Sequence, residues 1–323
     1  MFQIKDPKNL IFLEVEVEDE PKIKVAFPDA QIVTKMLGED EIIARFSQAE
    51  ILCTFIYSKI TEKVIQALPN LKLIVTRSVG YDHINLAAAA KRNILVCNVP
   101  DYGAHVIAEH VFALLLSSIR FIKEGDNRVE LRYFDFHGLR GIALKGKTMG
   151  IFGTGKIGKN VARIASLGFL MDVIAYDPFP DEDAARDHHF RYVSQEEVLE
   201  KSDIITLHVP FLKSTEHMIN RDSIAKMKNG VVLVNTARGG LIETEALVEA
   251  LRSKKIAYAA LDVLEHEDNI AQNDELVRLP NVIITPHIAF YADDTMKKMY
   301  SESLESIQEF LSGAKLKHQV LGI

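Results

Sequence analysis

The chain has 323 residues, a length that favours two domains because a single hydrophobic core stops growing near roughly 250–300 residues. Hydrophobic residues make up 48% of the sequence and charged residues 26%, which is the balance of a globular protein. The formal net charge of -7 and the lack of a long basic run argue against a nucleic-acid-binding protein, which needs a positively charged face.

The cysteines and the N-terminal segment indicate in which cellular compartment the protein is expected. Cys53 and Cys97 each lie in an apolar, strand-like run, so we expect two buried free thiols in a reducing compartment. The N-terminal sequence MFQIKDPKNLIF lacks the basic and apolar regions of a secretory signal. No charge-free apolar stretch reaches the roughly 18 residues of a membrane span. We therefore expect a cytoplasmic protein without a membrane partner.

The first third of the chain alternates between apolar β-rich runs and helical patterns, which is typical of a parallel sheet with crossover helices. One helix is expected in TEKVIQALPN, where Thr61 is the N-cap candidate and Pro69 ends the helix. A second is expected in NLAAAAKRN. The expected strands are EILCTFIY (50–57), LKLIVTR (71–77) and ILVCNV (94–99).

Residues 104–123 are predicted to form one long helix with a wide apolar surface. This surface exceeds what one core contact requires, so we expect it to pack against a second subunit as well. The positions that form it are Ile107, Val111, Phe112, Leu114, Leu115, Leu116, Ser118 and Ile119.

From residue 148 a second series of strands begins, near-continuously apolar as buried parallel strands are. An amphipathic helix over 293–313 is expected to end at Gly313. The charged stretch 181–190 is expected to be a solvated loop or helix, and its adjacent His188 and His189 point apart, so no metal site is predicted. The expected strands are TMGIFGTG, DVIAYD, DIITLHV, GVVLVNTAR, AYAALDV and NVIITPH.

The most specific motif is MGIFGTGKIGKNVARIASLG, in which Gly153, Gly155 and Gly158 follow the pattern G-x-G-x-x-G between a strand and a helix. Glycines allow the tight turn and the close approach of a pyrophosphate, and the helix N-terminus supplies N–H groups and partial positive charge. Asp177 ends the next strand at the expected spacing of about 20 residues, where a carboxylate binds ribose hydroxyls and repels a 2′-phosphate. The motif therefore predicts a site for NAD rather than NADP.

Ligands of open parallel sheets bind beyond the carboxyl ends of the strands, where this sequence places Arg238, Asp262 and His287. Reducing a 2-oxo acid with a nicotinamide needs a cation for the substrate carboxylate and a proton donor for the carbonyl oxygen, and histidine suits the second role. A carboxylate such as Glu267 would favour the charged imidazole and fix its tautomer. Each residue also has an ordinary interpretation, as part of a surface salt bridge, an acidic loop or a half-buried core edge.

Over nearly its whole length the chain resembles the D-isomer-specific 2-hydroxyacid dehydrogenases. The resemblance implies that Arg238, Glu267 (rather than Glu265) and His287 are catalytic. It also implies that the backbone N–H groups of Val79 and Gly80 bind the substrate carboxylate. The matching motifs are RSVGYDHINL, NVPDYGAHVIAEHVFALLL, GIFGTGKIGK, NTARGGLIETEAL, ALDVLEHED and LPNVIITPHIAFY.

The same resemblance implies two Rossmann-like or flavodoxin-like α/β domains with a cleft between them and a homodimeric assembly. The substrate domain would comprise 1–100 plus 290–323, and the NAD-binding Rossmann domain 101–289. Asp262 would hold the nicotinamide carboxamide. The further residues expected to bind the cofactor are Lys156, Ile157, His208, Val209, Pro210, Thr215, Thr236, Ala237, Arg238 and His287.

Within the family, two details point to the D-lactate dehydrogenase branch. Tyr102 can reach the substrate, and Phe290 and Tyr291 would narrow the substrate site for a small side chain. Phe55 is a further candidate for the wall of this site. The segment DNIAQNDELVR is shorter than that branch leads us to expect, which leaves the substrate's size open. The alternatives are a glyoxylate or hydroxypyruvate, phosphoglycerate, or branched or aromatic 2-oxo acid, and an NAD-sensing binding protein on the same fold.

Overall fold

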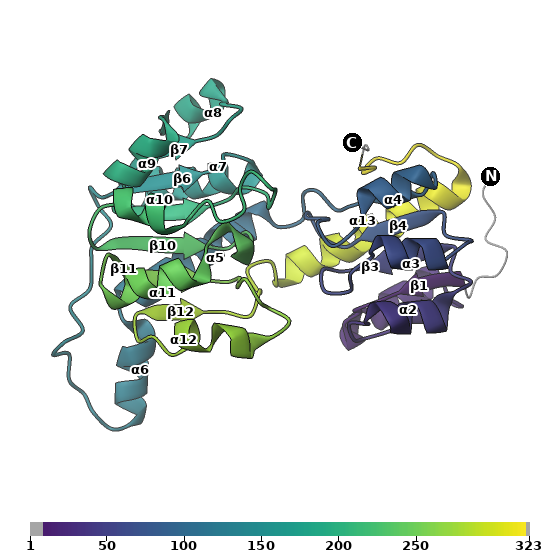
Figure 1. Cartoon of the computed structure of the whole chain (residues 1–323), viewed down its shortest axis with the longest axis horizontal. Coiled ribbons are helices and arrows are strands. Elements are labelled where there is room, and N and C mark those ends of the chain that lie inside the picture. Colours follow the sequence, from purple (N-terminus) through teal and green to yellow (C-terminus); the bar gives the residue numbers. More distant parts are fainter. Residues whose placement is uncertain (1–8, 321–323) are drawn as a thin grey trace. The chain divides into compact units, whose positions relative to one another are not determined.

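The computed structural model describes residues 9–320. Most of the N-terminal sequence MFQIKDPKNLIF, for which no secretory signal was predicted, lies outside the described residues. Two compact units form the chain (Figure 1). Unit 1 is the described part of Met1–Tyr102 and Ala292–Ile323, and unit 2 is Gly103–Tyr291. Each unit is built on one parallel sheet with helices on its faces, which confirms the predicted α/β class.

Unit 1 contains a five-stranded sheet in the order β2-β1-β3-β4-β5. Successive residues of its strands face opposite sides, so Ile11 packs with α2, α3 and α4 while Phe12 packs with α1 and α13. The strands are β1 (Leu10–Phe12), β2 (Gln31–Ile32), β3 (Ile51–Thr54), β4 (Leu73–Thr76) and β5 (Leu95–Cys97). The helices are α1 (Glu20–Ala26), α2 (Glu39–Phe46), α3 (Glu62–Ala67), α4 (Leu86–Lys91) and α13 (Asp293–Ser312).

Local sequence signals explain where the helices of unit 1 begin and end. The Thr61 side chain accepts a hydrogen bond from the Val64 N–H, as expected of the N-cap of α3. Helix α13 ends at Gly313, whose backbone is left-handed (φ 72°), which confirms the predicted C-terminus. Tyr300, Ile307 and other apolar residues of α13 pack on the unit 1 sheet, although this helix follows unit 2 in the sequence.

Unit 2 contains a seven-stranded sheet in the order β12-β11-β10-β9-β6-β7-β8. The chain runs from β6 outward to β8 and then crosses back to β9 on the other side of β6. Such a switch in direction opens a crevice at the carboxyl ends of the two neighbouring strands, where ligands bind. The strands are β6 (Thr148–Phe152), β7 (Asp172–Tyr176), β8 (Arg191–Tyr192), β9 (Ile204–Leu207), β10 (Val231–Asn235), β11 (Ile256–Leu261) and β12 (Val282–Ile284).

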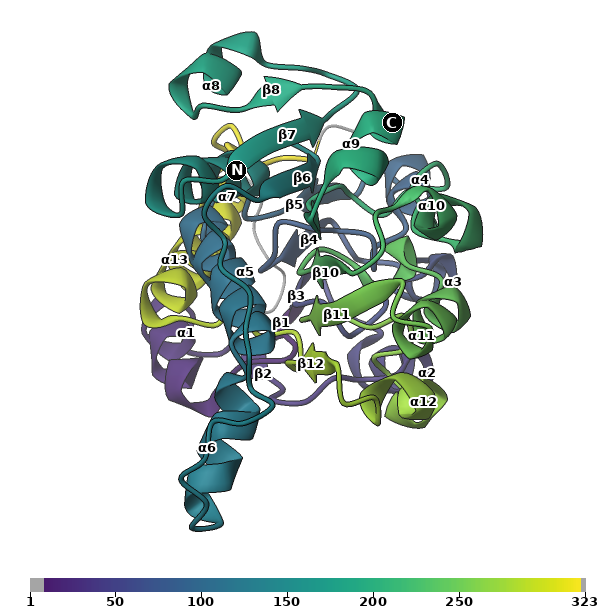
Figure 2. The same cartoon turned by 90° about the vertical axis from the view of Figure 1, so that its left-hand side faces the viewer.

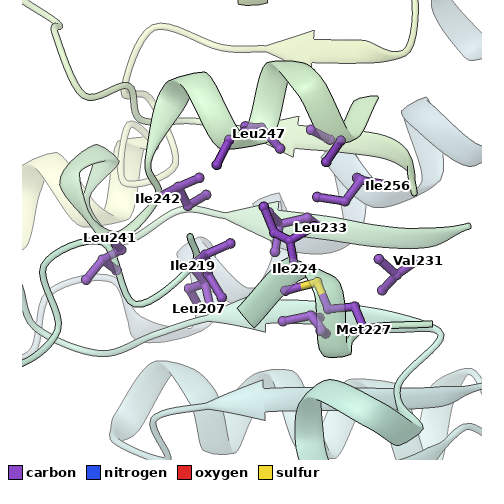
Figure 3. Close-up of a cluster of buried hydrophobic side chains, with 14 of the residues drawn as sticks. Leu207, Ile219, Ile224, Met227, Val231, Leu233, Leu241, Ile242, Leu247 and Ile256 are labelled. Carbon is purple, nitrogen blue, oxygen red and sulfur yellow. The ribbon is translucent and has the colours of Figure 1, made fainter. Parts of the chain in front are cut away.

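Helices cover both faces of the unit 2 sheet, with α5 and α11 on opposite sides (Figure 2). Figure 3 shows the core on the α10 and α11 side, where Leu233 lies among Ile224, Leu247 and Ile256. These strands are buried on both faces, which explains their nearly continuous apolar sequences. The helices are α5 (Ala104–Ile119), α6 (Ile122–Glu130), α7 (Lys156–Arg163), α8 (Glu182–Asp187), α9 (Gln195–Lys201), α10 (Arg221–Lys226), α11 (Thr244–Arg252) and α12 (Asp274–Val277).

The helix predicted over 104–123 is wrong at its C-terminal end. Helix α5 stops at Ile119, whose carbonyl oxygen accepts a hydrogen bond from the distant Ile142 N–H (3.1 Å). Phe121 then adopts a left-handed backbone (φ 54°) before α6 begins. Most apolar side chains of α5, including Val111 and Leu115, are buried in the core of unit 2. Its wide apolar surface is therefore largely used within the chain.

A run of exposed apolar side chains lies on α6 and the segment after it, which we call the arm (residues 122–137). The arm projects from the unit 2 sheet (Figures 1 and 2), and no residue of α6 is buried. The Phe134 side chain is 96% exposed and Phe136 is 79% exposed. Further exposed apolar residues of the arm are Ile122, Val129, Leu131 and Tyr133.

Strand β12 differs from the sequence prediction, and α7 and α8 add detail to it. Strand β12 is half-buried rather than buried, because it lies at the edge of the sheet. Helix α7 ends at Arg163 and is followed by a π-helical turn, Ile164–Gly168. The charged stretch 181–190 contains α8, in agreement with the expected loop or helix, and the N-cap of α8 is the Asp181 carboxylate.

Cys53 and Cys97 are buried free thiols, as predicted. Burial raises the pKa of the Cys97 thiol to about 12, with a smaller contribution from Glu309, and burial also raises the pKa of Cys53. Among residues 9–320 no single helix is long and apolar enough to cross a bilayer, and α5 with α6 reaches that length and composition only as a pair bent by 60°.

Candidate active site and nucleotide-binding loop

The glycine-rich loop joins β6 to α7, and its glycines have three different surroundings. A Cβ atom on Gly153 (φ 90°) would lie 2.6 Å from the His208 carbonyl oxygen, and one on Gly158 would lie 2.0 Å from the Gly153 oxygen. No atom lies within 4 Å of the corresponding point at Gly155. The first and third glycines therefore allow tight packing of loop and helix, whereas the second leaves open space at the helix N-terminus.

Asp177 follows β7 directly and is bound to this loop. Its Oδ2 accepts hydrogen bonds from the Thr154 N–H (2.7 Å) and the Thr154 hydroxyl (3.0 Å), and its Oδ1 accepts one from the Phe179 N–H (2.9 Å). A carboxylate has about four acceptor positions, so three are used by the chain. The remaining position on Oδ1 is suited to a ribose hydroxyl.

The segments after β9 and β10 lie at the same edge of the sheet. His208 pairs with the Thr206 hydroxyl (2.9 Å), and burial lowers the pKa of His208 to about 3, so its ring is neutral at physiological pH. The Thr215 hydroxyl donates to the Pro210 carbonyl (2.7 Å) and closes the loop after β9. Thr236, just after β10, has a buried hydroxyl with no hydrogen-bond partner in the described part of the chain.

These features fit a dinucleotide. The first N–H groups of α7, beginning with Lys156 and Ile157, have no acceptor within the helix and bear partial positive charge beside the open space at Gly155. The Thr236 hydroxyl supplies a polar group that still needs a partner. At the carboxyl edge of its sheet, unit 2 thus has open space at Gly155 and hydrogen-bond donors from α7 and Thr236. The Asp177 carboxylate provides a hydrogen-bond acceptor at the same edge.

His287 lies on the turn after β12 and pairs with Glu267. The distance from Nδ1 of His287 to Oε2 of Glu267 is 2.8 Å, and the Leu264 N–H donates to Oε1 of Glu267 (3.3 Å). The side chains are 16% and 29% exposed, so the pair remains accessible to a ligand. Because Nδ1 faces the carboxylate, the Nε2 atom is the one suited to proton transfer.

Asp262 holds the turn that carries His287. Its fully buried carboxylate accepts hydrogen bonds from the N–H groups of Ile288 (2.9 Å) and Ala289 (2.8 Å) and from the Thr285 hydroxyl (2.5 Å). The Asp262 carbonyl oxygen also accepts a hydrogen bond from the His287 N–H (2.8 Å). These bonds fix His287 in a left-handed backbone (φ 55°), which a non-glycine residue adopts only at a cost. The contact of Asp262 with a carboxamide stays a prediction.

Glu265 serves a different purpose from Glu267, although the two lie in the same acidic segment. Its Oε1 pairs with Nε2 of His217 (2.6 Å), and its Oε2 accepts from the hydroxyl (2.7 Å) and N–H (3.2 Å) of Thr244. Burial raises the pKa of Glu265, but the hydrogen bonds from Thr244 and His217 outweigh it and the net pKa is lowered. Glu265 thereby holds the start of α11, whereas Glu267 is the glutamate that pairs with His287, the histidine predicted to be catalytic.

Arg238 lies just beyond β10 on an extended backbone. One of its guanidinium nitrogens donates to the Ala237 carbonyl (2.8 Å), and its own carbonyl accepts from the Asn235 side chain (2.8 Å). The Ala237 N–H in turn donates to Asn235 Oδ1 (3.0 Å). A Cβ atom on Gly239 would lie 1.9 Å from the Leu264 carbonyl carbon, so the segment after Arg238 packs closely on the segment that leads to Glu267.

The residues predicted to bind substrate are divided between the units. Phe290 lies in unit 2, buried, with its ring centre 6.4 Å from that of His287. Phe55 and Tyr102 are buried in unit 1, where Val79 and Gly80 lie on the loop after β4, with Val79 exposed and Gly80 half-buried. Their roles toward a substrate stay predictions.

The sequence prediction missed His110 of α5. Its Nε2 lies 3.1 Å from the Thr285 hydroxyl and 3.5 Å from Asp262 Oδ1, so it extends the network that holds the His287 turn. A polar residue within the apolar helix 104–119 is the signal that could have revealed it. Among residues 9–320 no cluster of three or more His, Cys, Asp or Glu side chains could hold a metal ion.

Comparison with known proteins identifies many relatives. Residues 112–289 match the family model described as D-isomer specific 2-hydroxyacid dehydrogenase, NAD binding domain. A 2-hydroxyacid dehydrogenase homolog of Schizosaccharomyces pombe is 38% identical over 288 residues, covering 85% of this chain and 86% of the relative. An aromatic 2-oxoacid reductase of Clostridium sporogenes is 41% identical over 261 residues, covering 77% of this chain and 78% of the relative.

A solved structure extends the likeness to both units. The D-lactate dehydrogenase from Aquifex aeolicus, complexed with NAD and lactic acid, matches with a TM-score of 0.87 and 37% sequence identity. The match covers 94% of this chain and 96% of that chain.

Asp177 gives a prediction about cofactor choice. Replacing it with alanine removes both the acceptor for a ribose hydroxyl and the charge that repels a 2′-phosphate, so the preference for NADH over NADPH should fall about tenfold or more. The ratio of kcat/KM for the two cofactors measures this effect. Asp172→Ala, at the opposite end of β7, is the matched control. An unchanged ratio in Asp177→Ala would contradict the ribose role.

Proposed function

The chain belongs to the D-isomer-specific 2-hydroxyacid dehydrogenase family and uses NAD, and from this premise we propose that it interconverts pyruvate and D-lactate. The observation that carries the catalytic part of the proposal is the 2.8 Å pair of His287 and Glu267 at the carboxyl edge of the sheet. We assign NAD binding to unit 2 and substrate binding chiefly to unit 1.

The proposed reaction joins one hydride and one proton to a 2-oxo acid. The loop with Gly153, Gly155 and Gly158 and the Asp177 carboxylate would hold NADH, which when bound would supply the hydride for the carbonyl carbon. Nε2 of His287 donates the proton to the carbonyl oxygen, while Glu267 holds Nδ1 and stabilises the charged ring. Arg238 and the N–H groups of Val79 and Gly80 hold the substrate carboxylate, which fixes the carbonyl toward the donor. In the reverse direction His287 accepts the proton.

Two observations support a small substrate. Phe55, Tyr102 and Phe290 are bulky aromatic residues that we assign to the substrate site, where each would occupy space that a large substrate needs. The Aquifex aeolicus D-lactate dehydrogenase resembles this chain across both units. The second candidate is an aromatic 2-oxo acid, favoured by the 41% identity to the Clostridium sporogenes reductase.

A substrate panel tests the proposal. NADH oxidation should be fastest, by kcat/KM, with pyruvate and at least about tenfold slower with phenylpyruvate, because a buried aromatic wall excludes the larger side chain. 2-Oxoisocaproate and hydroxypyruvate complete the panel. A preference for phenylpyruvate would contradict pyruvate as the proposed substrate and favour an aromatic 2-oxo acid. NADH binding without turnover of any of these acids would favour a sensor.

The two neighbouring glutamates provide a test of the proton donor. His287→Gln should lower kcat by about 10²–10⁴-fold with NADH affinity nearly intact. Glu267→Gln should lower kcat about 10- to 100-fold, the equivalent of a lost charge-assisted hydrogen bond of about 1.5–3 kcal/mol. Glu265→Gln is the matched control, since it perturbs α11 and His217 instead. Equal losses of kcat in the two glutamate variants would argue against the assigned roles.

We also propose that the protein is a homodimer and that the arm, rather than α5, contributes the contact. The arm exposes Leu131, Tyr133, Phe134 and Phe136 in succession along the chain, an apolar surface that a second copy would remove from water. A cytoplasmic location is proposed on the basis of the two buried free thiols.

Sedimentation velocity tests the arm. The double variant Leu131→Asp/Phe134→Asp should sediment as a monomer under conditions in which the wild type is a dimer, because two buried apolar side chains contribute about 3–6 kcal/mol. Val25→Asp replaces an equally exposed apolar residue of unit 1 and should leave the dimer intact. If the double variant is still a dimer, the arm is not part of the dimer interface and this proposal is wrong.

A further inference from the structure

The loop after β4 is suited to binding a carboxylate only if two consecutive N–H groups, those of Val79 and Gly80, point the same way. A pair of backbone N–H groups forms an anion-binding site when the peptides that carry them are held in place. The loop is exposed, with Val79 39% accessible, so burial alone does not hold these peptides. Other contacts must therefore orient them.

Peptide geometry shows what orients an N–H group. The C=O of one residue and the N–H of the next lie in one rigid plane and point in opposite directions. A hydrogen bond to the Ser78 carbonyl therefore fixes the Val79 N–H, and a hydrogen bond to the Val79 carbonyl fixes the Gly80 N–H.

Both of these carbonyls are held from the segment that follows β5. The Ser78 oxygen accepts from the Val99 N–H (3.0 Å), and the Val79 oxygen accepts from the side-chain amide of Asn98 (2.8 Å). The Gly80 oxygen accepts from the Ser78 hydroxyl (2.5 Å), so three consecutive carbonyl oxygens of the loop are hydrogen-bonded. Within residues 9–320 the N–H groups of Val79 and Gly80 donate to no acceptor of the chain.

Asn98 itself is firmly placed. It directly follows β5, which pairs with β4, and its N–H donates to the His318 carbonyl (3.2 Å). Two contacts orient the N–H pair. The contact from Val99 is made by its backbone N–H, so any residue at position 99 except proline could make it. The contact from Asn98 depends on a side chain that donates a hydrogen bond.

We infer that Asn98 is a positioning residue, whose side-chain amide turns the Val79–Gly80 peptide so that its N–H points at the substrate carboxylate. This inference rests on the proposed function, and it adds a residue that does not touch the substrate. Losing Asn98 frees one peptide plane and weakens substrate binding, whereas hydride transfer and NADH binding depend on other residues.

Two variants and a control test the inference. Asn98→Ala should raise KM for pyruvate about 3- to 10-fold, the effect of one hydrogen bond of about 0.5–1.5 kcal/mol, with kcat changed less than about twofold. Asn98→Asp should raise KM further, because its carboxylate cannot donate to the Val79 carbonyl and adds a negative charge near the substrate. The dissociation constant of NADH, measured by fluorescence, should stay unchanged in both.

Thr61→Ala is the matched control, because it removes one side-chain hydrogen bond from unit 1 at the N-cap of α3. It should lower Tm to a similar extent and leave KM unchanged. If the Asn98 variants lower Tm but keep the wild-type KM, Asn98 only stabilises the loop and the inference is wrong. If the wild type reduces pyruvate, the proposed function holds, and an unchanged KM in the Asn98 variants then contradicts the inference alone. A wild type that neither binds nor reduces any 2-oxo acid would overturn both.

Discussion

The candidate site depends on the buried carboxylate of Asp262. An ionised carboxylate without solvent is costly unless hydrogen bonds replace the lost water, and here two backbone N–H groups and the Thr285 hydroxyl do so. Burial raises the pKa of Asp262, but the hydrogen bonds from His110, Thr285, Ala289 and Ile288 outweigh it, so the net pKa is lowered and the group stays charged. These same bonds hold His287 in its left-handed backbone, within 2.8 Å of Glu267.

The parallel sheet explains how distant sequence segments reach one site. The strands β10, β11 and β12 are neighbours and end at one edge of the unit 2 sheet, so the residues after them, Arg238, Asp262 and His287, lie on adjacent loops. The glycine-rich loop follows β6 at the same edge, next to the switch in strand order. Each loop is held by its own hydrogen bonds, which leaves side chains such as His287 available for chemistry rather than for structure.

Local patterns allowed the sequence to predict the α/β class, the glycine-rich loop and the strands that carry Arg238 and His287. Features set by distant contacts were not predictable in this way. Helix α5 ends early because the Ile119 carbonyl bonds to Ile142, and β12 is half-buried because no strand covers its outer side. The roles of His110 and Asn98 likewise depend on residues far away in the chain, and apolar periodicity carries no information about such partners.

The stereospecificity of lactate oxidation depends on how hydride, proton donor and substrate carboxylate are arranged, and it can be measured with the two isomers. NAD⁺ reduction should be followed by the near-ultraviolet absorbance of the NADH that forms, with D-lactate and L-lactate supplied separately. We predict reduction with D-lactate and none above background with L-lactate, because the contacts to the substrate carboxylate and the position of His287 would fix which face of the carbon exchanges hydride. Equal rates with both isomers, or reduction with L-lactate alone, would contradict it.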